Sequence, residues 1–196
     1  MARSNQELEQ FAYVASHDLR EPLRMITSFL QLLERRYTEQ LDNDANEFIG
    51  YAVDGAKRLD NMIKDLLQYS QVTRKKVTFL PVNSELVLEQ TLINLKVPID
   101  ENKAIITHGS LPTIKGDAEL LVLLFQNLIS NSIKYRSDKT PKIDISAKKE
   151  DNHYLFSIKD NGIGMSTKYL DRIFIIFQRL HTMDEFDGTG IGLAIA

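Results

Sequence analysis

The stretch that decides the fold of this chain is Phe11-Ala-Tyr-Val-Ala-Ser-His17-Asp18-Leu-Arg-Glu21-Pro22-Leu-Arg-Met-Ile-Thr-Ser-Phe29. Apolar residues in and around it recur in alternating steps of four and three, which is the spacing of a helix that packs in a bundle. We call this set the first seam; its members are Leu8, Ala12, Ala15, Leu19, Pro22, Ile26, Phe29 and Leu33. The spacing predicts one long helix from about Asn5 to Tyr37.

His17 lies two residues past Ala15 and off the first seam, so its imidazole is expected on the outer face of the helix. An exposed His can equally be an ordinary solvated residue. Two neighbours favour a reactive group. Asp18 can orient an imidazole or take its proton, and Pro22 removes a helical N–H and loosens the helix one turn beyond the His. His17 is therefore a candidate nucleophile.

A second helix with the same rhythm is predicted after the polar break at 38–44, with Asp42 or Asn43 as its N-cap. Two long helices joined by a short loop form an antiparallel hairpin. A lone hairpin leaves much of its apolar stripe uncovered, whereas two hairpins paired in a four-helix bundle bury it. We therefore predict a homodimer. The alternative is a hairpin that packs on the rest of its own chain. The apolar positions of the second helix are Ala45, Ile49, Ala52, Ala56, Leu59, Ile63, Leu66 and Ser70.

The composition of the 196 residues limits the possible functions. A net charge of −3 does not support a nucleic-acid-binding surface. The absence of Cys excludes disulfides, thiolate zinc sites and cysteine nucleophiles, and it is compatible with a reducing cytoplasm. No apolar run approaches about 20 residues, so no membrane contact is expected.

The pattern changes after residue 76, where we place a domain boundary. A strand is predicted at 77–82 and a helix from Asn83 or Ser84 to about Lys96. A short β-like run at 104–107 follows, and then a helix that is capped by Asp117 and runs to about Tyr135. The apolar face of this helix is expected at Leu120, Leu121, Leu124, Leu128 and Ile129. The alternating runs 142–149 and 154–159 flank a polar turn and predict a hairpin. Helices on one face of a mixed sheet give an α+β layer architecture.

Three polar residues of the helix that begins at Asp117 are spaced i, i+4 and i+7 and so share one stripe. They are Asn127, Asn131 and Lys134. Amide oxygens suit a magnesium ion and an ammonium suits a phosphate. By itself, such a stripe is more often a solvated helix face.

Two glycine clusters follow. The first, Asp160-Asn-Gly162-Ile-Gly164, comes directly after a predicted strand, and Asp160 could accept a hydrogen bond from an amino group. The second, Gly188-Thr-Gly190-Ile-Gly192, opens onto an apolar run and could offer backbone N–H groups to a phosphate. Each alone could be a turn. Neither is a P-loop or a Rossmann fingerprint.

Between the two glycine clusters lies an apolar and aromatic segment, 173–181, followed by the charged stretch 182–187. Apolar anchors inside a long connection bounded by glycines predict a lid over a ligand. The alternative is that Phe174 and Phe177 simply pack in a core, and both can be true.

Five motifs, in this order, resemble those of sensor histidine kinases. The sequence His17-Asp-Leu-Arg-Glu-Pro22 resembles their H box, and Asn127-Leu-Ile-Ser-Asn131-Ser-Ile-Lys134-Tyr135 resembles their N box. The two glycine clusters resemble the two glycine boxes, and Phe174 to Phe177 resembles the F box between them. The sequences Phe-Ala-Tyr-Val-Ala-Ser-His at 11–17 and Phe-Gln-Arg-Leu-His at 177–181 most resemble those of the transmitter modules of phytochrome-like kinases. Each motif alone is weak evidence for this resemblance, whereas all five together are strong evidence.

The resemblance implies a hairpin for dimerisation and histidine phosphotransfer at 1–76, followed by a gyrase/Hsp90-like ATP-binding domain, an α/β sandwich, at 77–196. It implies that His17 attacks the γ-phosphate of ATP through Nε2, while Asp18 holds or deprotonates Nδ1. The phosphoryl group then passes to an Asp of a response-regulator receiver domain docked near His17. The signal comes from a sensor domain outside this chain, and the protein is cytoplasmic.

The resemblance also assigns the residues that hold ATP and Mg²⁺. Asn131, assisted by Asn127, holds magnesium, and Asp160 binds the adenine amino group. Lys134 and Tyr135 lie along the phosphates. Arg179 is our own candidate for a cation that reaches the γ-phosphate when the lid closes. The lid and phosphate loop are shaped by Gly162, Gly164, Gly188, Thr189, Gly190 and Gly192.

Two departures from the family pattern stand out. Relatives with phosphatase activity often carry Thr or Asn four residues after the His, and this chain has Glu21. A carboxylate orients an attacking water poorly, so little phosphatase activity is expected. The family's last helix and further strands would continue past Ala196, so we expect a truncated nucleotide domain with an open sheet edge.

Two competing functions remain at this point. In one, the truncated nucleotide domain is inactive and the chain is a dimeric phosphotransfer or scaffold module. In the other, the chain is a non-kinase ATPase of the gyrase/Hsp90-like superfamily. The seamed hairpin that carries His17 and Asp18 counts against the second, because such ATPases need no element of this kind.

Overall fold

The structure is a computed structural model that describes residues 2–75, 77–180, 186 and 188–196, with side chains from Leu19 onward except that of Arg74. Its internal contacts divide the chain into two compact units, Met1–Arg74 and Lys75–Ala196.

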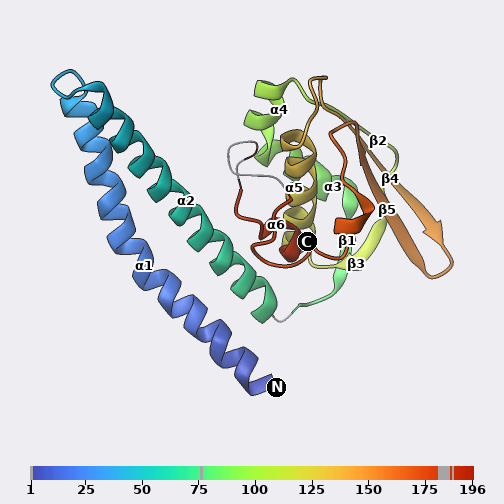
Figure 1. The fold of residues 1–196 in the computed structure, drawn as a ribbon. Coiled ribbons are helices and arrows are strands. Elements are labelled where there is room, and N and C mark those ends of the chain that lie inside the picture. The colour runs from blue at the N-terminus through green and yellow to red at the C-terminus, as the bar shows by residue number, and fades with distance from the viewer. Residues whose placement is uncertain (1, 76, 181–185, 187) are drawn as a thin grey trace. The chain divides into compact units, whose positions relative to one another are not determined.

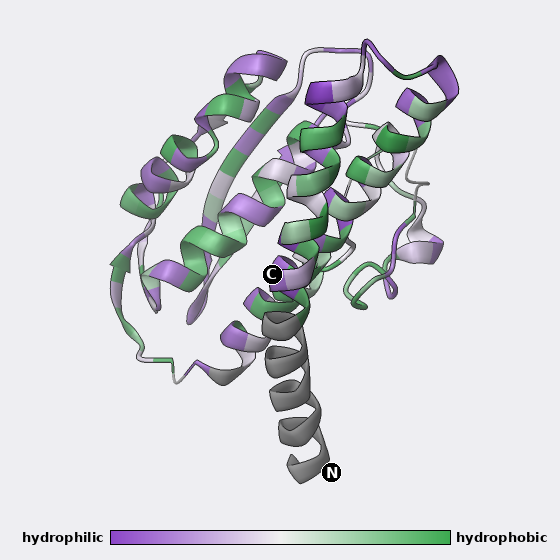
Figure 2. Cartoon of the chain, turned by 90° about the vertical axis from the view of Figure 1, so that its left-hand side faces the viewer, coloured by the Kyte–Doolittle hydropathy of each residue, from purple (hydrophilic) through white to green (hydrophobic). Residues whose placement is uncertain are grey.

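The first unit is a hairpin of two long helices, α1 (Ala2–Tyr37) and α2 (Asn43–Arg74), joined by a short loop (Figure 1). The carboxylate Oδ1 of Asp42 accepts a hydrogen bond from the backbone N–H of Ala45 at 2.8 Å, which is the N-cap geometry that the sequence predicted. Asn46 Nδ2 donates to the carbonyl of Thr38 at 2.9 Å and closes the loop. Hydrophobic and hydrophilic residues alternate along the helices (Figure 2).

Within the hairpin, the two helices pack through a few small and aliphatic side chains. The buried ones among the described residues are Leu23 on α1 and Val53, Ala56, Leu67 and Ser70 on α2. This contact face of α1 lies one residue, about 100°, away from the first seam. The first seam is therefore a separate face of α1, distinct from the one that holds the hairpin together.

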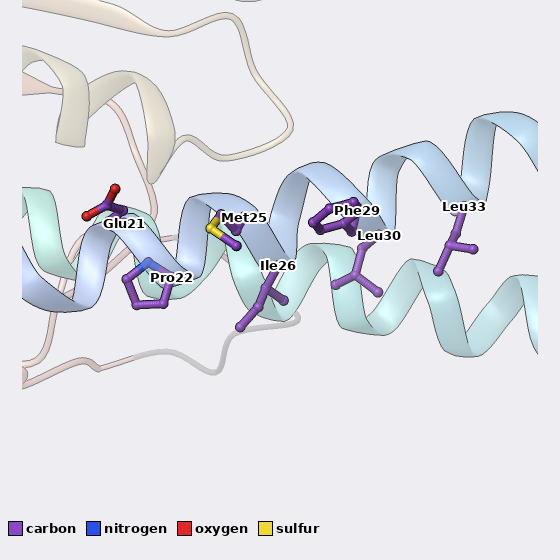
Figure 3. A pocket seen from close by; sticks show the side chains of 7 residues that line it. All are labelled: Glu21, Pro22, Met25, Ile26, Phe29, Leu30 and Leu33. Atoms are coloured by element: carbon purple, nitrogen blue, oxygen red, sulfur yellow. The ribbon is translucent and has the colours of Figure 1, made fainter.

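The described part of the first seam, from Leu19 onward, is exposed in the single chain. Leu19, Ile26 and Phe29 keep 57%, 53% and 62% of their surface exposed. Of these, Ile26 and Phe29 border an apolar groove of about 550 Å³ along α1 (Figure 3). The groove is lined by Glu21, Pro22, Met25, Ile26, Phe29, Leu30 and Leu33.

The second unit begins with strand β1 (Leu80–Asn83) and helix α3 (Ser84–Asn94). Asn83 caps α3, its side chain accepting the N–H of Glu85 at 2.9 Å. The chain then forms a further helix, α4 (Lys96–Asn102), which the sequence analysis did not predict. Pro98 fits there because the first turn of a helix needs no proline N–H, and Lys103 ends the helix in the left-handed conformation.

The sheet of the second unit has the order β2-β4-β5, from Ile105–His108, Lys142–Glu150 and His153–Asp160. Strands β2 and β4 are parallel, and β4 and β5 form the predicted antiparallel hairpin, so the sheet is mixed as expected. Strand β1 does not extend it. Instead, β1 pairs antiparallel with β3 (Thr113–Gly116) in a separate two-stranded sheet.

Helices α3 and α5 (Ala118–Lys134) cover one face of the mixed sheet (Figure 1). Asp117 caps α5 as predicted, accepting the N–H groups of Glu119 and Leu120. The expected apolar face of α5 is confirmed only in part: Ile129 is buried and Leu121 packs against the core, whereas Leu120, Leu124 and Leu128 are not among the buried positions. The buried residues of α5 are Phe125, Ile129, Ser132 and Ile133. Almost the whole helix is at least half-buried, so a one-sided pattern does not identify its core face. A 3₁₀ turn (Thr167–Tyr169) and the short helix α6 (Gly192–Ile195) complete the unit.

The core of the second unit joins α3, α5 and strand β4. The β4 side chains alternate, with Ile143 and Ile145 almost fully buried between exposed neighbours. The Phe125 ring on α5 meets the Phe156 ring on β5 edge-on at 6.0 Å. The buried residues of this core are Val82, Val87, Leu88, Leu95, Leu111, Phe125, Ile129, Ile133, Ile143 and Ile145.

Candidate functional site

The polar stripe of α5 is not a solvated face. Asn127, Asn131 and Lys134 are all half-buried. The Nδ2 amide nitrogen of Asn127 is buried and has no hydrogen-bond partner among the described residues. A buried donor without a partner costs free energy, and native structures contain few of them. The stripe therefore holds a donor that a bound group could satisfy.

The second glycine cluster lies against this stripe. A Cβ at Gly188 would come within 2.4 Å of Lys134 Nζ, and a Cβ at Gly192 would come within 3.4 Å of Asn127 Oδ1. Gly188 also has φ near +141°, which other residues rarely adopt. Segments more than fifty positions apart in sequence thus meet at the polar stripe. Thr189 Oγ1 accepts the N–H of Ile191 at 3.4 Å inside the same cluster.

The first glycine cluster is tied to the C-terminal end of the same helix. Asp160 is the last residue of β5, and its Oδ1 accepts the N–H of Gly162 at 2.9 Å. The N–H of Ile163 donates to the carbonyl of Tyr135 at 3.0 Å. A Cβ at Gly162 would lie 2.4 Å from that same carbonyl oxygen, so only glycine fits there. Gly164 has φ near +67° and a glycine-type turn instead of a close contact.

The connection between the two clusters closes on itself. The N–H of Phe177 donates to the carbonyl of Gly190 at 3.1 Å, and Gly190 leaves no room for a Cβ beside the carbonyl of Gln178. Arg179 Nη2 donates to the carbonyl of Phe186. The Phe186 ring lies 5.0 Å from the Tyr135 ring at the end of α5. The connection therefore starts and ends beside the polar stripe.

Phe174 and Phe177 do not pack in a core. They are 60% and 50% exposed, so the alternative of simple core packing was wrong for the described residues. The predicted lid, 173–187, is described here only in part, because residues 181–185 and 187 lie outside the described residues.

His17 and Asp18 lie within helix α1, as predicted, but their side chains are outside the described part of the chain. Among the described residues, no group of three or more His, Cys, Asp or Glu side chains could hold a metal ion. A cation bound at the stripe of α5 would therefore rely on the amide oxygens of Asn127 and Asn131 and on its ligand. None of the described helices is long and apolar enough to cross a membrane.

The sequence analysis missed two polar contacts of α5. At its C-terminal half, the Ser132 hydroxyl lies 3.3 Å from Oδ2 of Asp160. At its start, Lys75 Nζ contacts Asp117 Oδ2 at 2.9 Å and Glu119 Oε2 at 2.6 Å. No sequence pattern marks either, because the partners are 28 and more than 40 positions apart.

The Lys75 contacts shift the ionisation of the groups involved. Hydrogen bonds to Glu119 and then to Asp117 raise the pKa of Lys75 above its usual 10.5. The bond from Lys75, followed by the Leu120 N–H, holds the pKa of Asp117 below its usual 3.8. The N-cap of α5 is thus a charged junction.

Two known protein families match this chain, one in each of its two units. Residues 7–75 match the family described as the His Kinase A (phospho-acceptor) domain. Residues 116–196 match the family described as histidine kinase-, DNA gyrase B- and HSP90-like ATPase. The chain belongs to the histidine kinases.

This histidine kinase chain is similar to phytochromes of cyanobacteria. It is 51% identical over 195 residues to cyanobacterial phytochrome A of Nostoc sp. strain PCC 7120, and 47% identical over 197 residues to phytochrome-like protein Cph1 of Synechocystis sp. strain PCC 6803. Each alignment covers the whole of this chain and 26% of the relative. The chain thus spans about a quarter of the length of these relatives.

Solved histidine kinase structures share the fold. Full-length ShkA, crystallised in complex with AMPPNP, matches 95% of this chain with 39% of its own length, at a TM-score of 0.67 and 24% identity. The histidine kinase AdeS of Acinetobacter baumannii matches 89% of this chain with 82% of its own, at a TM-score of 0.57 and 22% identity. At these identities the likeness shows the fold alone.

Proposed function

We propose that this chain is the ATP-dependent kinase core of a two-component system: it phosphorylates His17 and passes the phosphoryl group to an Asp of a response regulator. One observation carries the proposal. The polar stripe of α5 meets Gly188 and Gly192 of the second glycine cluster, inside the segment that matches the ATPase family. The hairpin that matches the phospho-acceptor family carries His17.

The residues around the stripe fit a magnesium triphosphate. The unpartnered Nδ2 of Asn127 can donate to a phosphate oxygen, which would remove the cost of its burial. Lys134 Nζ lies beside Gly188 and supplies a positive charge at the glycine cluster. Asn131, with Asn127, would hold Mg²⁺ through amide oxygens. When bound, the cation neutralises charge on the phosphates.

Other residues of the site have more specific roles in this proposal. Asp160 accepts a hydrogen bond from the adenine amino group, and Tyr135 lies along the nucleotide beside Lys134. Arg179 reaches the γ-phosphate when the lid closes. The backbone of the cluster Gly188-Thr189-Gly190 lines the phosphates, and Gly162 and Gly164 shape the turn next to Asp160.

At the phosphoacceptor, the neutral imidazole attacks with the lone pair of Nε2. The Nε2–phosphorus bond forms while the bond from phosphorus to the bridging oxygen of ADP breaks, and ADP leaves. Asp18 accepts the Nδ1 proton, which keeps Nε2 free for attack and removes positive charge from the phosphorylated ring. The reaction needs mostly position and charge neutralisation, which these groups supply.

The proposal includes a homodimer formed by the first seam. Leu19, Ile26 and Phe29 are more than half exposed, and with Leu33 they follow a heptad spacing. Ile26, Phe29 and Leu33 line an apolar groove (Figure 3). A second hairpin that covers this face would complete a four-helix bundle. We place the phosphotransfer hairpin at 1–76, the ATP-binding domain at 77–196, and the protein in the cytoplasm. A receiver domain would dock on the hairpin near His17.

The test is incubation with γ-labelled ATP and Mg²⁺, for the parent chain and for His17→Gln. The proposal predicts label on the parent that is lost in acid and retained in alkali, as expected for phosphohistidine, and none on His17→Gln. Label on both proteins would contradict the assignment of His17. ATP binding without label on the parent would contradict kinase activity, and absence of binding would favour the inactive phosphotransfer module.

A further inference from the structure

Ser132 is a buried polar residue inside α5 whose role the nucleotide chemistry leaves open. Only 8% of its surface is exposed, and it lies among the buried residues Ile129 and Ile133, which belong to the core of the second unit. Its hydroxyl oxygen lies 3.0 Å from the carbonyl of Leu128 and 3.3 Å from Oδ2 of Asp160. The hydroxyl has only one proton, so the two oxygens compete to accept it.

The carboxylate is the acceptor that gains most from this proton. The Leu128 carbonyl stands one helical turn before Ser132 and already accepts the backbone N–H of that residue in the α-helix. A serine hydroxyl in any helix can make this local contact. The contact to Asp160 joins α5 to the end of β5, across 28 positions of sequence. A hydrogen bond to an ionised oxygen is about twice as strong as one between neutral groups.

The contact from Ser132 completes the support of the Asp160 carboxylate. Oδ1 accepts the N–H of Gly162 at 2.9 Å, and Oδ2 faces the Ser132 hydroxyl. With one donor at each oxygen, rotation of the carboxylate about its terminal bond is opposed from both sides. Asp160 is otherwise an exposed residue at the end of a strand, where a carboxylate held by one bond would keep more rotational freedom.

We propose that Ser132 is a positioning residue for Asp160 and thereby a determinant of selectivity for purine nucleotides that carry an amino group. It holds Oδ2 in place so that the carboxylate presents its remaining acceptor positions in one direction. An acceptor held in place costs less to order when ligand binds. The inference rests on the proposed contact between Asp160 and the adenine amino group.

The experiment compares ATP with purine ribonucleoside triphosphate, which lacks the amino group, by calorimetric titration of the full chain. The variants are Ser132→Ala, Ser132→Thr and Asp160→Ala, with Ser130→Ala as a matched control on the same helix. We expect Ser132→Ala to weaken ATP binding by about three- to tenfold, the worth of one hydrogen bond, and to leave the amino-free nucleotide within twofold. Ser132→Thr, which keeps the hydroxyl, retains the parent's preference, and so does Ser130→Ala.

Four results would overturn the inference. Equal losses for both nucleotides in Ser132→Ala would make the residue merely structural, and unchanged ATP binding would make its hydroxyl irrelevant. If Asp160→Ala leaves the preference for ATP intact, the proposed adenine contact itself fails. A preference lost in Asp160→Ala but kept in Ser132→Ala refutes only the role of Ser132. Ser132→Cys, of nearly equal volume and a weak donor, carries the same comparison if the alanine variant does not fold.

Discussion

The hairpin and the α/β unit bury their apolar residues in different ways. In the second unit, α3, α5 and β4 enclose a shared core, and Ile129, Ile143 and Ile145 have at most 1% of their surface exposed. In the hairpin, the described part of α1 has one buried aliphatic residue, Leu23, while Phe29 is 62% exposed. The heptad pattern of the hairpin thus marks a face that is exposed in the single chain and that the proposed dimer would cover, whereas alternation in a strand marks the chain's own core.

The largest expected effect concerns the exposed face of the hairpin. Phe29→Asp should raise the dissociation constant of the dimer by about 100-fold or more, because each copy loses the burial of one Phe, worth about 1.5–3 kcal/mol, and gains a charge. Analytical ultracentrifugation over a range of concentrations measures this. Ile93→Asp is the matched control, since Ile93 is 68% exposed on α3 of the other unit. A parent that stays monomeric, or two variants that dissociate equally, would refute the proposed seam.

A smaller effect is expected at the close contact that ties the first glycine cluster to α5. Gly162→Ala places a Cβ 2.4 Å from the carbonyl oxygen of Tyr135, where backbone has to move. Overpacking of this kind costs about 1–3 kcal/mol. The urea-induced unfolding of the second unit should therefore shift to lower concentration.

Gly109→Ala is the control for this substitution, because nothing lies within 4 Å of its Cβ position. It should leave the unfolding midpoint of the second unit almost unchanged. Equal midpoints for Gly162→Ala and Gly109→Ala would show that the turn after β5 is not fixed against α5 as described.

The smallest effect is the pH dependence of the charged junction at the start of α5. The folded-state pKa of Asp117 is below its usual 3.8, so its contribution to stability is present above that pH and is lost as the pH falls through the folded-state value. Asp117→Asn keeps an N-cap side chain but removes the charge. The difference in urea midpoint between parent and variant should narrow as the pH is lowered from about 7 to about 3.

Lys75, the partner of Asp117, makes stability depend on pH on the alkaline side. Its pKa is raised above 10.5, so its contribution is present below that pH and is lost as the pH rises through the folded-state value. The exposed Asp138 serves as the control, and Asp138→Asn should leave the midpoint close to that of the parent. A parent–variant difference for Asp117→Asn that stays constant down to pH 3 would contradict the ion pair.

Local signals predicted the elements that local chemistry specifies. Asp42, Asn83 and Asp117 cap their helices as expected, and the alternation around Ile143 and Ile145 gave the β4–β5 hairpin. Helix α4 was missed because its seven residues are too few to show a helical period. The core face of α5 was predicted only in part, at Ile129 and Leu121, because almost the whole helix is at least half-buried.

The candidate site was predictable only as far as its motifs. The stripe of α5 and the two glycine clusters could be read from spacing, but their meeting could not, because it depends on how the connection folds back. Two hydrogen bonds illustrate this: the N–H of Ile163 donates to the carbonyl of Tyr135, and the Ser132 hydroxyl contacts Asp160. In each pair the two residues are 28 positions apart in sequence, and no sequence pattern links them. Such long-range contacts result from the packing of the whole unit. The motifs of the site could therefore be predicted from the sequence, but their proximity in space could not.

We propose that the polar stripe of α5, which faces the second glycine cluster, is the ATP site. The most direct measurement is calorimetric titration with ATP and Mg²⁺ of the parent, of Asn131→Ala, and of Gln126→Ala, a half-buried residue of α5 that is off the stripe. We predict that Asn131→Ala weakens binding at least about tenfold, as expected when a charge-assisted contact worth about 1.5 kcal/mol or more is lost, and that Gln126→Ala stays within about twofold. Equal binding by all three proteins would contradict the claim.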